Sequence, residues 1–364
     1  MHVHAFYELG RKRTTIPDES KRTNRSRDAV ISEIIRNFAA KRDKEMKFNY
    51  RLHEVAPYIN WLYFFHTWGF SAQYSSVAKL HDCESCRAQW LASFSDGERP
   101  KAREAMQLYS DALTLLQRFD DQFETHALVA LYRANSEGDD IILYTPTQPT
   151  RKTGGNDIAT LRPKPWGEGM GLRLPMLRQQ TGESCLSWAD FILPFETGRQ
   201  DTLGVFVTSV DEAMEQSFPD DDYRHLLSQT LADRLAEATA ERMHQQVRTQ
   251  IWGYAADEKL DVEDLFKERY VGRRPAVGFP SLPDQSINFI IDSLIGMSDI
   301  GVSLTESGAM RPHASTSGLL FSHPKARHFS IGIIGDDQLQ DYAHRRGMSP
   351  AVMRRFLAAN LPSC

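Results

Sequence analysis

The segment Tyr270-Val-Gly-Arg-Arg-Pro-Ala-Val-Gly-Phe-Pro-Ser-Leu-Pro-Asp284 contains three prolines and two glycines in fifteen residues. Proline fixes φ and removes a backbone donor, so this segment is not expected to form a helix or a central strand. It also differs from a disordered linker, because Arg273, Arg274 and Phe279 stand among apolar residues. We therefore predict a stiff, extended, turn-rich segment. An arginine held in it is suited to bind a carboxylate or phosphate, since guanidinium presents a planar fork of donors.

The composition is that of an ordinary globular protein. Of the 364 residues, 25% are charged and 41% are hydrophobic. No apolar run approaches the roughly 20 residues that a membrane-spanning helix needs, and the N-terminus lacks the apolar core of a signal peptide. The four cysteines are too few for a disulfide scaffold in a chain of this size. We therefore expect a cytoplasmic protein that does not associate with membranes.

The charge is unevenly distributed along the chain. The net charge of −5 divides into +5 for residues 1–50 and −10 for the remainder. A mildly acidic body argues against nucleic-acid binding. The basic start is interpreted as a solvated tail, followed from Asp28 by an amphipathic helix with apolar residues at helical spacing. We therefore predict a basic tail plus helix over 1–47 and a single large domain over 48–364.

Hydrophobic periodicity in the body predicts strands in runs, separated by long helices. The helices are expected over 101–118 and 222–250, and the strands over 128–132, 141–144, 189–194 and 202–209. The strict alternation of strand and helix that is typical of a parallel doubly wound sheet is missing. The sequence also lacks a dinucleotide-binding glycine fingerprint, a phosphate loop and a nucleophile elbow. The predicted class is α+β, with a twisted antiparallel sheet flanked by long helices.

Two cysteines are close in sequence at Cys83-Glu-Ser-Cys86, and His81 lies beside them. Such a spacing is compatible with a redox-active pair or with half of a zinc site. Cys185 and Cys364 do not form a second pair of this kind. The interpretation that we favour from the sequence is incidental thiols.

Eight motifs resemble one family closely. In family order, from about residue 48 to the C-terminus, they resemble the activation (reactivation) domain of cobalamin-dependent methionine synthase, which binds S-adenosylmethionine. The motifs are Tyr58-Ile-Asn-Trp61 with Phe64-Phe65 and Thr67-Trp68, Ala134-Asn-Ser-Glu-Gly-Asp-Asp-Ile141, Leu231-Ala-Asp-Arg-Leu-Ala-Glu-Ala238, Trp252-Gly-Tyr254, Gly272-Arg-Arg-Pro-Ala-Val-Gly-Phe-Pro280, Leu304-Thr-Glu-Ser307, Phe321-Ser-His-Pro324 and Asp341-Tyr-Ala-His-Arg-Arg-Gly-Met-Ser349. The family's homocysteine-, folate- and cobalamin-binding modules have no counterpart in this sequence. The resemblance thus implies the reactivation subunit of a split methionine synthase, which does not make methionine alone.

The resemblance also implies a reaction and its partners. Cobalamin in the Co(I) state is occasionally oxidised to inactive Co(II), and reactivation needs one electron, usually from flavodoxin, and a methyl group from S-adenosylmethionine. We expect this chain to bind S-adenosylmethionine and to present it to cobalamin carried by a partner module, with a flavodoxin-like electron donor. The sulfonium methyl is already activated, so the chain's task is to position the donor rather than to transfer protons.

The implied ligand-binding residues follow from the matching motifs. Arg274 would pair with the donor's carboxylate, Ala276 would offer backbone contacts beside it, and Glu237 would bind the amino group. The other implied binding residues are Asn60, Gly278, Phe279, His328 and Phe329. No catalytic or metal-ligating residue is implied.

The sequence departs from the family pattern at three places. Asn60 replaces the usual aspartate, His328-Phe329 replaces an aromatic pair that is often Tyr-Tyr, and Arg311 and His313 stand where Trp and Gly are usual. Asparagine keeps an acceptor but loses the charge. A charge-assisted hydrogen bond contributes about 1.5–3 kcal/mol, against roughly 1 kcal/mol for a neutral one. The departures leave an alternative open, namely a non-catalytic module that recognises a corrinoid protein and has weakened or lost S-adenosylmethionine binding.

Overall fold

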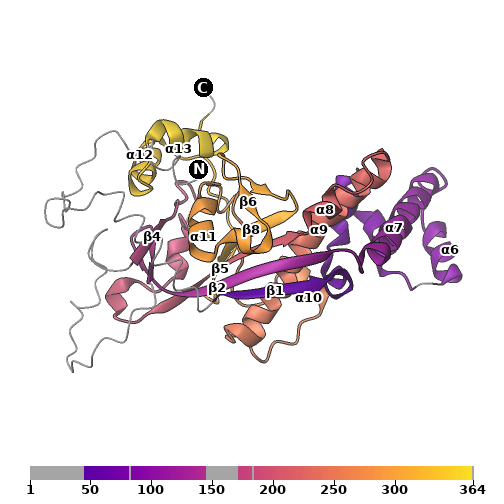
Figure 1. Cartoon of the computed structure of the whole chain (residues 1–364), viewed down its shortest axis with the longest axis horizontal. Coiled ribbons are helices and arrows are strands. Elements are labelled where there is room, and N and C mark those ends of the chain that lie inside the picture. The colour runs from indigo at the N-terminus through magenta and orange to yellow at the C-terminus, as the bar shows by residue number, and fades with distance from the viewer. Residues whose placement is uncertain (1–44, 82, 145–170, 183, 363–364) are drawn as a thin grey trace.

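The computed structural model describes residues 45–81, 83–144, 171–182 and 184–362 (Figure 1). The helix predicted from Asp28 lies outside these residues. Within them the chain forms one domain of helices and antiparallel strands, which confirms the predicted α+β class. None of the described helices combines the length and the apolar character that crossing a membrane requires.

The centre of the domain is a six-stranded sheet in the order β4-β3-β2-β5-β8, with β1 also paired to β2. Its strands are β1 (Met46–Arg51), β2 (Glu124–Glu137), β3 (Asp140–Tyr144), β4 (Gly171–Pro175), β5 (Asp201–Val210) and β8 (Ser315–Leu320). All neighbouring strands are antiparallel. The long strand β2 pairs along one edge with β1 in its first half and with β3 in its second half. A separate small hairpin is formed by β6 (Ser303–Leu304) and β7 (Met310–Arg311).

Helices surround this sheet. The α-helices are α4 (Leu52–Val55), α5 (Trp61–Thr67), α6 (Glu84–Ala92), α7 (Arg99–Phe119), α8 (Glu212–Glu215), α9 (Asp222–Gln246), α10 (Val262–Phe266), α11 (Ile287–Ile295), α12 (Asp336–Arg345) and α13 (Pro350–Phe356). The 3-10 helices are η1 (Ala56–Tyr58), η2 (Ala72–Lys79), η4 (Trp188–Phe191), η5 (Phe195–Thr197), η7 (Met297–Ile300) and η8 (Ala358–Asn360). A π-helical turn, Val247–Ile251, extends α9. Helices α6 and α7 lie at one end of the long axis, and α12 and α13 lie toward the other (Figure 1).

Both faces of the sheet pack against apolar cores. Side chains alternate along each strand, so neighbouring residues belong to different cores. On β5 and β8, Phe206 and Leu320 belong to the apolar core that includes α7 and α9. Their neighbours Val205, Val207 and Leu319 belong to the core on the opposite face, which includes α11. A third apolar cluster holds α12 and α13 against the domain.

Two local predictions were wrong. The strand expected over 128–132 extends to Glu137 in β2, so the turn before β3 is only Gly138-Asp139. The polar Asn135 is satisfied there because its amide donates to the carbonyl oxygens of Leu193 and Arg199, at 3.0 and 2.7 Å. The first half of the strand expected over 189–194 is instead part of η4, a 3-10 helix, and the second half is irregular apart from an isolated bridge at Pro194. The capping side chains of η4 draw the backbone into a turn.

We call the segment 270–284 the proline-rich segment. As predicted it combines extended backbone, which lies along β8 over 273–276, with turns over 277–282. Arg273 and Phe321 exchange both backbone hydrogen bonds, each of 2.9 Å. The Leu319 N–H donates to the Pro275 carbonyl at 3.1 Å, so the missing N–H of the proline costs no hydrogen bond in this pairing. The proline-rich segment therefore covers the outer edge of β8.

Gly318 on β8 permits this close approach. A Cβ at this position would lie 2.1 Å from the Pro275 carbonyl oxygen and 2.9 Å from the Ala276 Cα. Both neighbours are backbone atoms, so a side chain of any kind would force the two segments apart. The position of Arg274 therefore depends on a glycine in another strand.

We predict that Gly318→Ala lowers the free energy of unfolding by about 1–3 kcal/mol, the usual cost of overpacking. Gly97→Ala is the matched control, because a Cβ there would meet nothing within 4 Å. Urea denaturation of both variants measures the difference. Equal stabilities for the two variants would contradict the assignment of Gly318 as a contact position.

Candidate functional site

The candidate site lies where one face of α9 meets the proline-rich segment. Glu237, Glu241, His244 and Arg248 recur at helical spacing and so share a face of α9 and its π-helical extension. Glu241, His244 and Arg248 are buried although they are polar. Each of these three contacts or faces the proline-rich segment, so the charged face of α9 is matched by charged and aromatic groups opposite.

The central contact of the site is an ion pair between Arg274 and Glu241. Nη2 of Arg274 lies 2.9 Å from Oε2 of Glu241, and the two side chains are only 16% and 12% exposed. The guanidinium also lies over the Phe206 ring, 5.7 Å from its centroid. Among the described residues, Nε of Arg274 and Oε1 of Glu241 are buried without a hydrogen-bond partner. Because buried polar atoms are usually paired, both groups retain the capacity to bind a polar ligand.

A second buried ion pair anchors the start of the proline-rich segment. Arg248 donates to both carboxylate oxygens of Glu258, at 2.9 and 2.7 Å, and both side chains are buried. The Arg248 guanidinium lies 4.1 Å from the centroid of the Tyr270 ring, close enough for a cation–π interaction. The His244 ring meets the same tyrosine edge-on. Burial, and then the charge of Arg248, hold the pKa of His244 well below its usual value.

Glu237 lies at the edge of the same face, and its side chain is 45% exposed. It pairs with Arg234 at 2.8 Å, one turn earlier on α9. Burial raises the pKa of Glu237, while the charges of Arg234 and Arg274 oppose that shift. Glu237 and Arg274 are thus within electrostatic range, although they are far apart in the sequence.

Asn60 lies near α9 because its motif is hydrogen-bonded to that helix. It is the N-cap of α5, and its side-chain oxygen accepts the Leu62 N–H at 3.2 Å. In the same motif, Tyr58 donates to Gln245 of α9 at 2.7 Å. No hydrogen bond joins Asn60 to Arg274 in the described part of the chain. The structure therefore places Asn60 on the α9 side of the fold but occupies its side chain with a cap.

Three predicted residues follow Arg274 on the proline-rich segment. Ala276 is buried, and its carbonyl accepts the Phe279 N–H at 3.3 Å. Gly278 has a φ of +89°, which favours glycine, and its N–H donates to Leu282. The turn that results leaves the Phe279 ring exposed.

The predicted pair His328-Phe329 lies beside the site. Nε2 of His328 is 3.4 Å from Oε1 of Glu268. Burial lowers the pKa of His328, with Glu268 opposing and Arg273 and Arg274 adding to the shift. Phe329 packs against Trp188, with ring centroids 5.1 Å apart. His328 is therefore electrostatically coupled to Arg274, whereas Phe329 belongs to the apolar core next to it.

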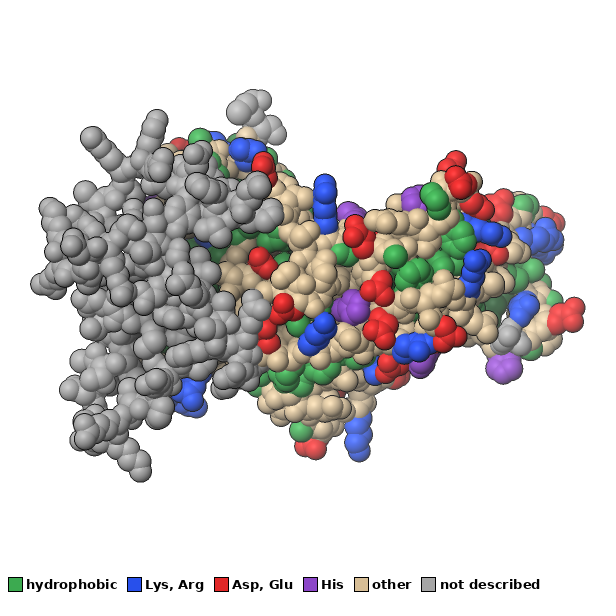
Figure 2. Space-filling view, in the orientation of Figure 1, with side chains coloured by type: hydrophobic (Ala, Val, Ile, Leu, Met, Phe, Trp, Pro, Cys, Tyr) green, Lys and Arg blue, Asp and Glu red, His purple; other side chains and the backbone are tan. Residues whose placement is uncertain are grey.

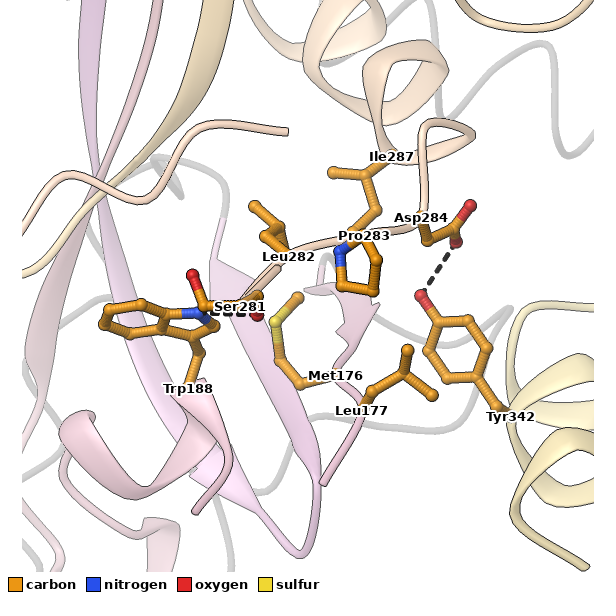
Figure 3. Close-up of a pocket in the computed structure, with 9 residues that line it drawn as sticks. All are labelled: Met176, Leu177, Trp188, Ser281, Leu282, Pro283, Asp284, Ile287 and Tyr342. Atoms are coloured by element: carbon orange, nitrogen blue, oxygen red, sulfur yellow. Dashed lines mark hydrogen bonds between the residues drawn. The ribbon is translucent and has the colours of Figure 1, made fainter. Parts of the chain in front are cut away.

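A small cavity at the other end of the proline-rich segment is separate from this cluster (Figure 3). It is lined by Met176, Leu177, Trp188, Ser281, Leu282, Pro283, Asp284, Ile287 and Tyr342. Tyr342 donates to Asp284 at 2.8 Å, and the Trp188 indole donates to the Ser281 carbonyl at 2.9 Å. None of the predicted site residues lines the cavity. Its lining fastens the end of the proline-rich segment to α12, which is a structural role.

The sequence reasoning missed Glu241 and Arg248, which hold the proline-rich segment through Arg274 and Tyr270. A signal was present, because both residues follow Glu237 at helical spacing along the predicted helix. Charged residues recurring on one helical face beside an apolar stripe could equally form a solvated face. The contacts that distinguish the two cases come from a segment distant in sequence.

The fold and site define an α+β domain with a charged ligand-binding cluster between a long helix and an extended edge segment. A family model described as vitamin B12 dependent methionine synthase, activation domain, matches residues 51–347. The chain belongs to this family, which confirms the resemblance. It is also similar to a solved structure described as "Crystal Structure of the MetH Reactivation Domain bound to AdoHcy". The sequences are 32% identical with a TM-score of 0.73, over 88% of this chain and 91% of that chain.

We predict that Glu258→Ala destabilises the protein by about 3–5 kcal/mol, because it leaves Arg248 buried without its partner. Glu263→Ala is the control, since its pair with Lys79 is 54% and 68% exposed. Loss of that surface pair should cost no more than about 1 kcal/mol. Chemical denaturation compares the two variants, and similar losses would show that the buried pair is not an anchor.

Proposed function

We propose that this chain binds S-adenosylmethionine and presents its methyl group to cobalamin held by a cobalamin-binding module, so that methionine synthase is reactivated. The observation that carries the proposal is the placement of Arg274 within electrostatic range of Glu237. An amino acid has one carboxylate and one ammonium group, and these two side chains offer the opposite charges. The similar solved structure is described as bound to AdoHcy, which shares this amino-acid end and the nucleoside with S-adenosylmethionine.

Each residue has a distinct task in this proposal. Arg274 gives one donor to Glu241 and keeps its Nε and remaining N–H groups for the ligand's carboxylate. Glu237 accepts hydrogen bonds from the ammonium group through its partly exposed carboxylate. Ala276 offers backbone contacts beside them. The ligand supplies a methyl group activated by its sulfonium, and these residues orient it without transferring a proton.

The surface beside the site supports docking of a partner module. Val271, Phe279 and Ile333 are exposed large apolar side chains. The first two belong to the proline-rich segment. The third is held near it because the Ile331 N–H donates to the Pro280 carbonyl at 2.9 Å. Exposed apolar groups of this kind often mark an interaction surface.

The described part of the face in Figure 2 carries interspersed acidic and basic side chains rather than a basic stripe. This distribution fits a protein or cofactor partner better than a nucleic acid. A flavodoxin-like electron donor and a cobalamin module on a separate chain stay predictions from the family resemblance. A cytoplasmic location stays a prediction from the composition and the N-terminal sequence.

Two observations favour the alternative, a corrinoid-protein interaction module with weakened S-adenosylmethionine binding. Asn60 lacks the carboxylate that is usual in the family, and its oxygen is already used as a helix cap. Burial lowers the pKa of His328, and its imidazole lacks the phenol hydroxyl of the tyrosine that is usual in the family.

We predict that Arg274→Ala weakens S-adenosylmethionine binding by at least about tenfold, the effect of losing a charge-assisted hydrogen bond of about 1.5–3 kcal/mol. Isothermal titration calorimetry measures the affinities. Arg224→Ala is the control, because Arg224 is an exposed arginine in the first turn of α9, outside the candidate site.

A wild-type chain that gives neither heat nor thermal stabilisation at millimolar S-adenosylmethionine would overturn the donor-binding proposal. Mixing the chain with a separately produced cobalamin-binding module then decides between the two functions. With a one-electron reductant added and S-adenosylmethionine below saturation, the main proposal predicts that Arg274→Ala lowers reductive methylation in the mixture. Under the alternative it leaves complex formation intact and there is no methylation to lose.

We predict that Asn60→Asp tightens S-adenosylmethionine binding by about tenfold, since a neutral hydrogen bond becomes charge-assisted. Aspartate is as good an N-cap as asparagine, so α5 should be unaffected. The same substitution at the exposed Asn49 adds an equal charge away from the site and serves as the control. An unchanged affinity for Asn60→Asp would show that the missing carboxylate does not limit binding.

A further inference from the structure

We propose that His81, Cys83 and Cys86 form a binding site for a thiophilic divalent cation of the zinc class. The three residues lie between η2 and the first turn of α6. One ring nitrogen of the histidine and the two sulfurs all lie within 4.8 Å of one another. Around zinc, with bonds of about 2.3 Å to sulfur and 2.0–2.1 Å to nitrogen, tetrahedral ligand atoms are roughly 3.3–3.8 Å apart. Small side-chain rotations therefore suffice to close the site on a cation.

The local backbone holds the two thiols on the same side. Cys83 is the N-cap of α6, and its sulfur accepts the Cys86 N–H at 3.2 Å. The Ser85 hydroxyl is also close to this sulfur, at 3.3 Å. Both thiols are free of disulfide bonds and only partly buried, so a cation from solution reaches them.

The histidine distinguishes a metal site from a redox pair. A disulfide would use only the two sulfurs, whereas His81 places a third donor at the same point. Two sulfurs and an imidazole suit zinc and similar cations, while magnesium and calcium prefer oxygen donors. The grouping of His81 with both thiols favours a metal site over the interpretation of the thiols as incidental.

The site would fasten two segments of the end of the domain that carries α6 and α7 (Figure 1). The Trp90 indole of α6 already donates to Ser76 of η2 at 2.9 Å. A cation bound by His81, Cys83 and Cys86 would add a second link across the same connection. Three protein ligands leave a fourth tetrahedral position for water or for a donor from a partner.

Zinc titration of the full, reduced chain against a chromophoric chelator tests the proposal. Cys185→Ser and Cys364→Ser remove the other two thiols from the background. We expect one zinc per chain and a rise in melting temperature on zinc addition. Removing a direct ligand should cost more than the roughly 10–100-fold that loss of an outer partner costs. Cys83→Ser, Cys86→Ser and His81→Ala should therefore each weaken binding at least that much.

Ser85→Ala and His66→Ala are the matched controls, because they remove a nearby hydroxyl and an exposed imidazole that are not ligands. Cobalt added in place of zinc should give a sulfur-to-metal charge-transfer band that Cys83→Ser weakens and that removal of both thiols abolishes. The proposal is overturned if the chain binds no zinc tightly enough to compete with the chelator. It is also overturned if His81→Ala binds zinc like the wild type. Circular dichroism shows whether each variant is folded.

Discussion

The close pairing of the proline-rich segment with β8 is the constraint on which the candidate site depends. Gly318 allows the Pro275 carbonyl to approach to a distance that a Cβ would prevent. Backbone hydrogen bonds on both sides of this point fix the direction of the segment. Arg274 lies between them, so its guanidinium is aimed at α9 by backbone geometry before any side-chain contact forms. Positioning of this kind reduces the conformational entropy that a ligand must otherwise overcome.

Buried charges then hold the segment at its two ends and its middle. The pairs are Arg248–Glu258, Arg274–Glu241 and Arg346–Asp284. Burying an ion pair is expensive and adds little net stability, but removing one partner is severely destabilising. Such pairs therefore favour one arrangement over its alternatives more than they raise stability. The Arg274–Glu241 pair differs from the other two because both partners keep an unused buried polar atom among the described residues. This spare capacity suits the pair to a charged ligand.

Much of the fold followed from local patterns in the sequence. Prolines and glycines predicted the extended 270–284 segment, and apolar spacing predicted α9 and the α+β class. Local patterns failed where a polar residue is satisfied from a distance. The strand predicted over 128–132 stopped short of Asn135, because a polar residue favours a turn unless its side chain is hydrogen-bonded. Its partners, the Leu193 and Arg199 carbonyls, lie far away in the sequence. The same holds for the candidate site. Arg274 was identified through the family resemblance, whereas Glu241 could be identified only once the packing of α9 against the proline-rich segment was known.

Asn60 shows how one side chain can serve local structure and a site at the same time. An N-cap must accept a backbone N–H, and asparagine and aspartate do so about equally well. The capping hydrogen bond of α5 therefore does not select between them, and the two residues differ in charge. A positive N-terminal helix end already favours a negative charge at this position. Asn60 therefore lacks a small stabilising interaction with the helix end. The larger effect of the missing carboxylate is expected on ligand binding rather than on folding.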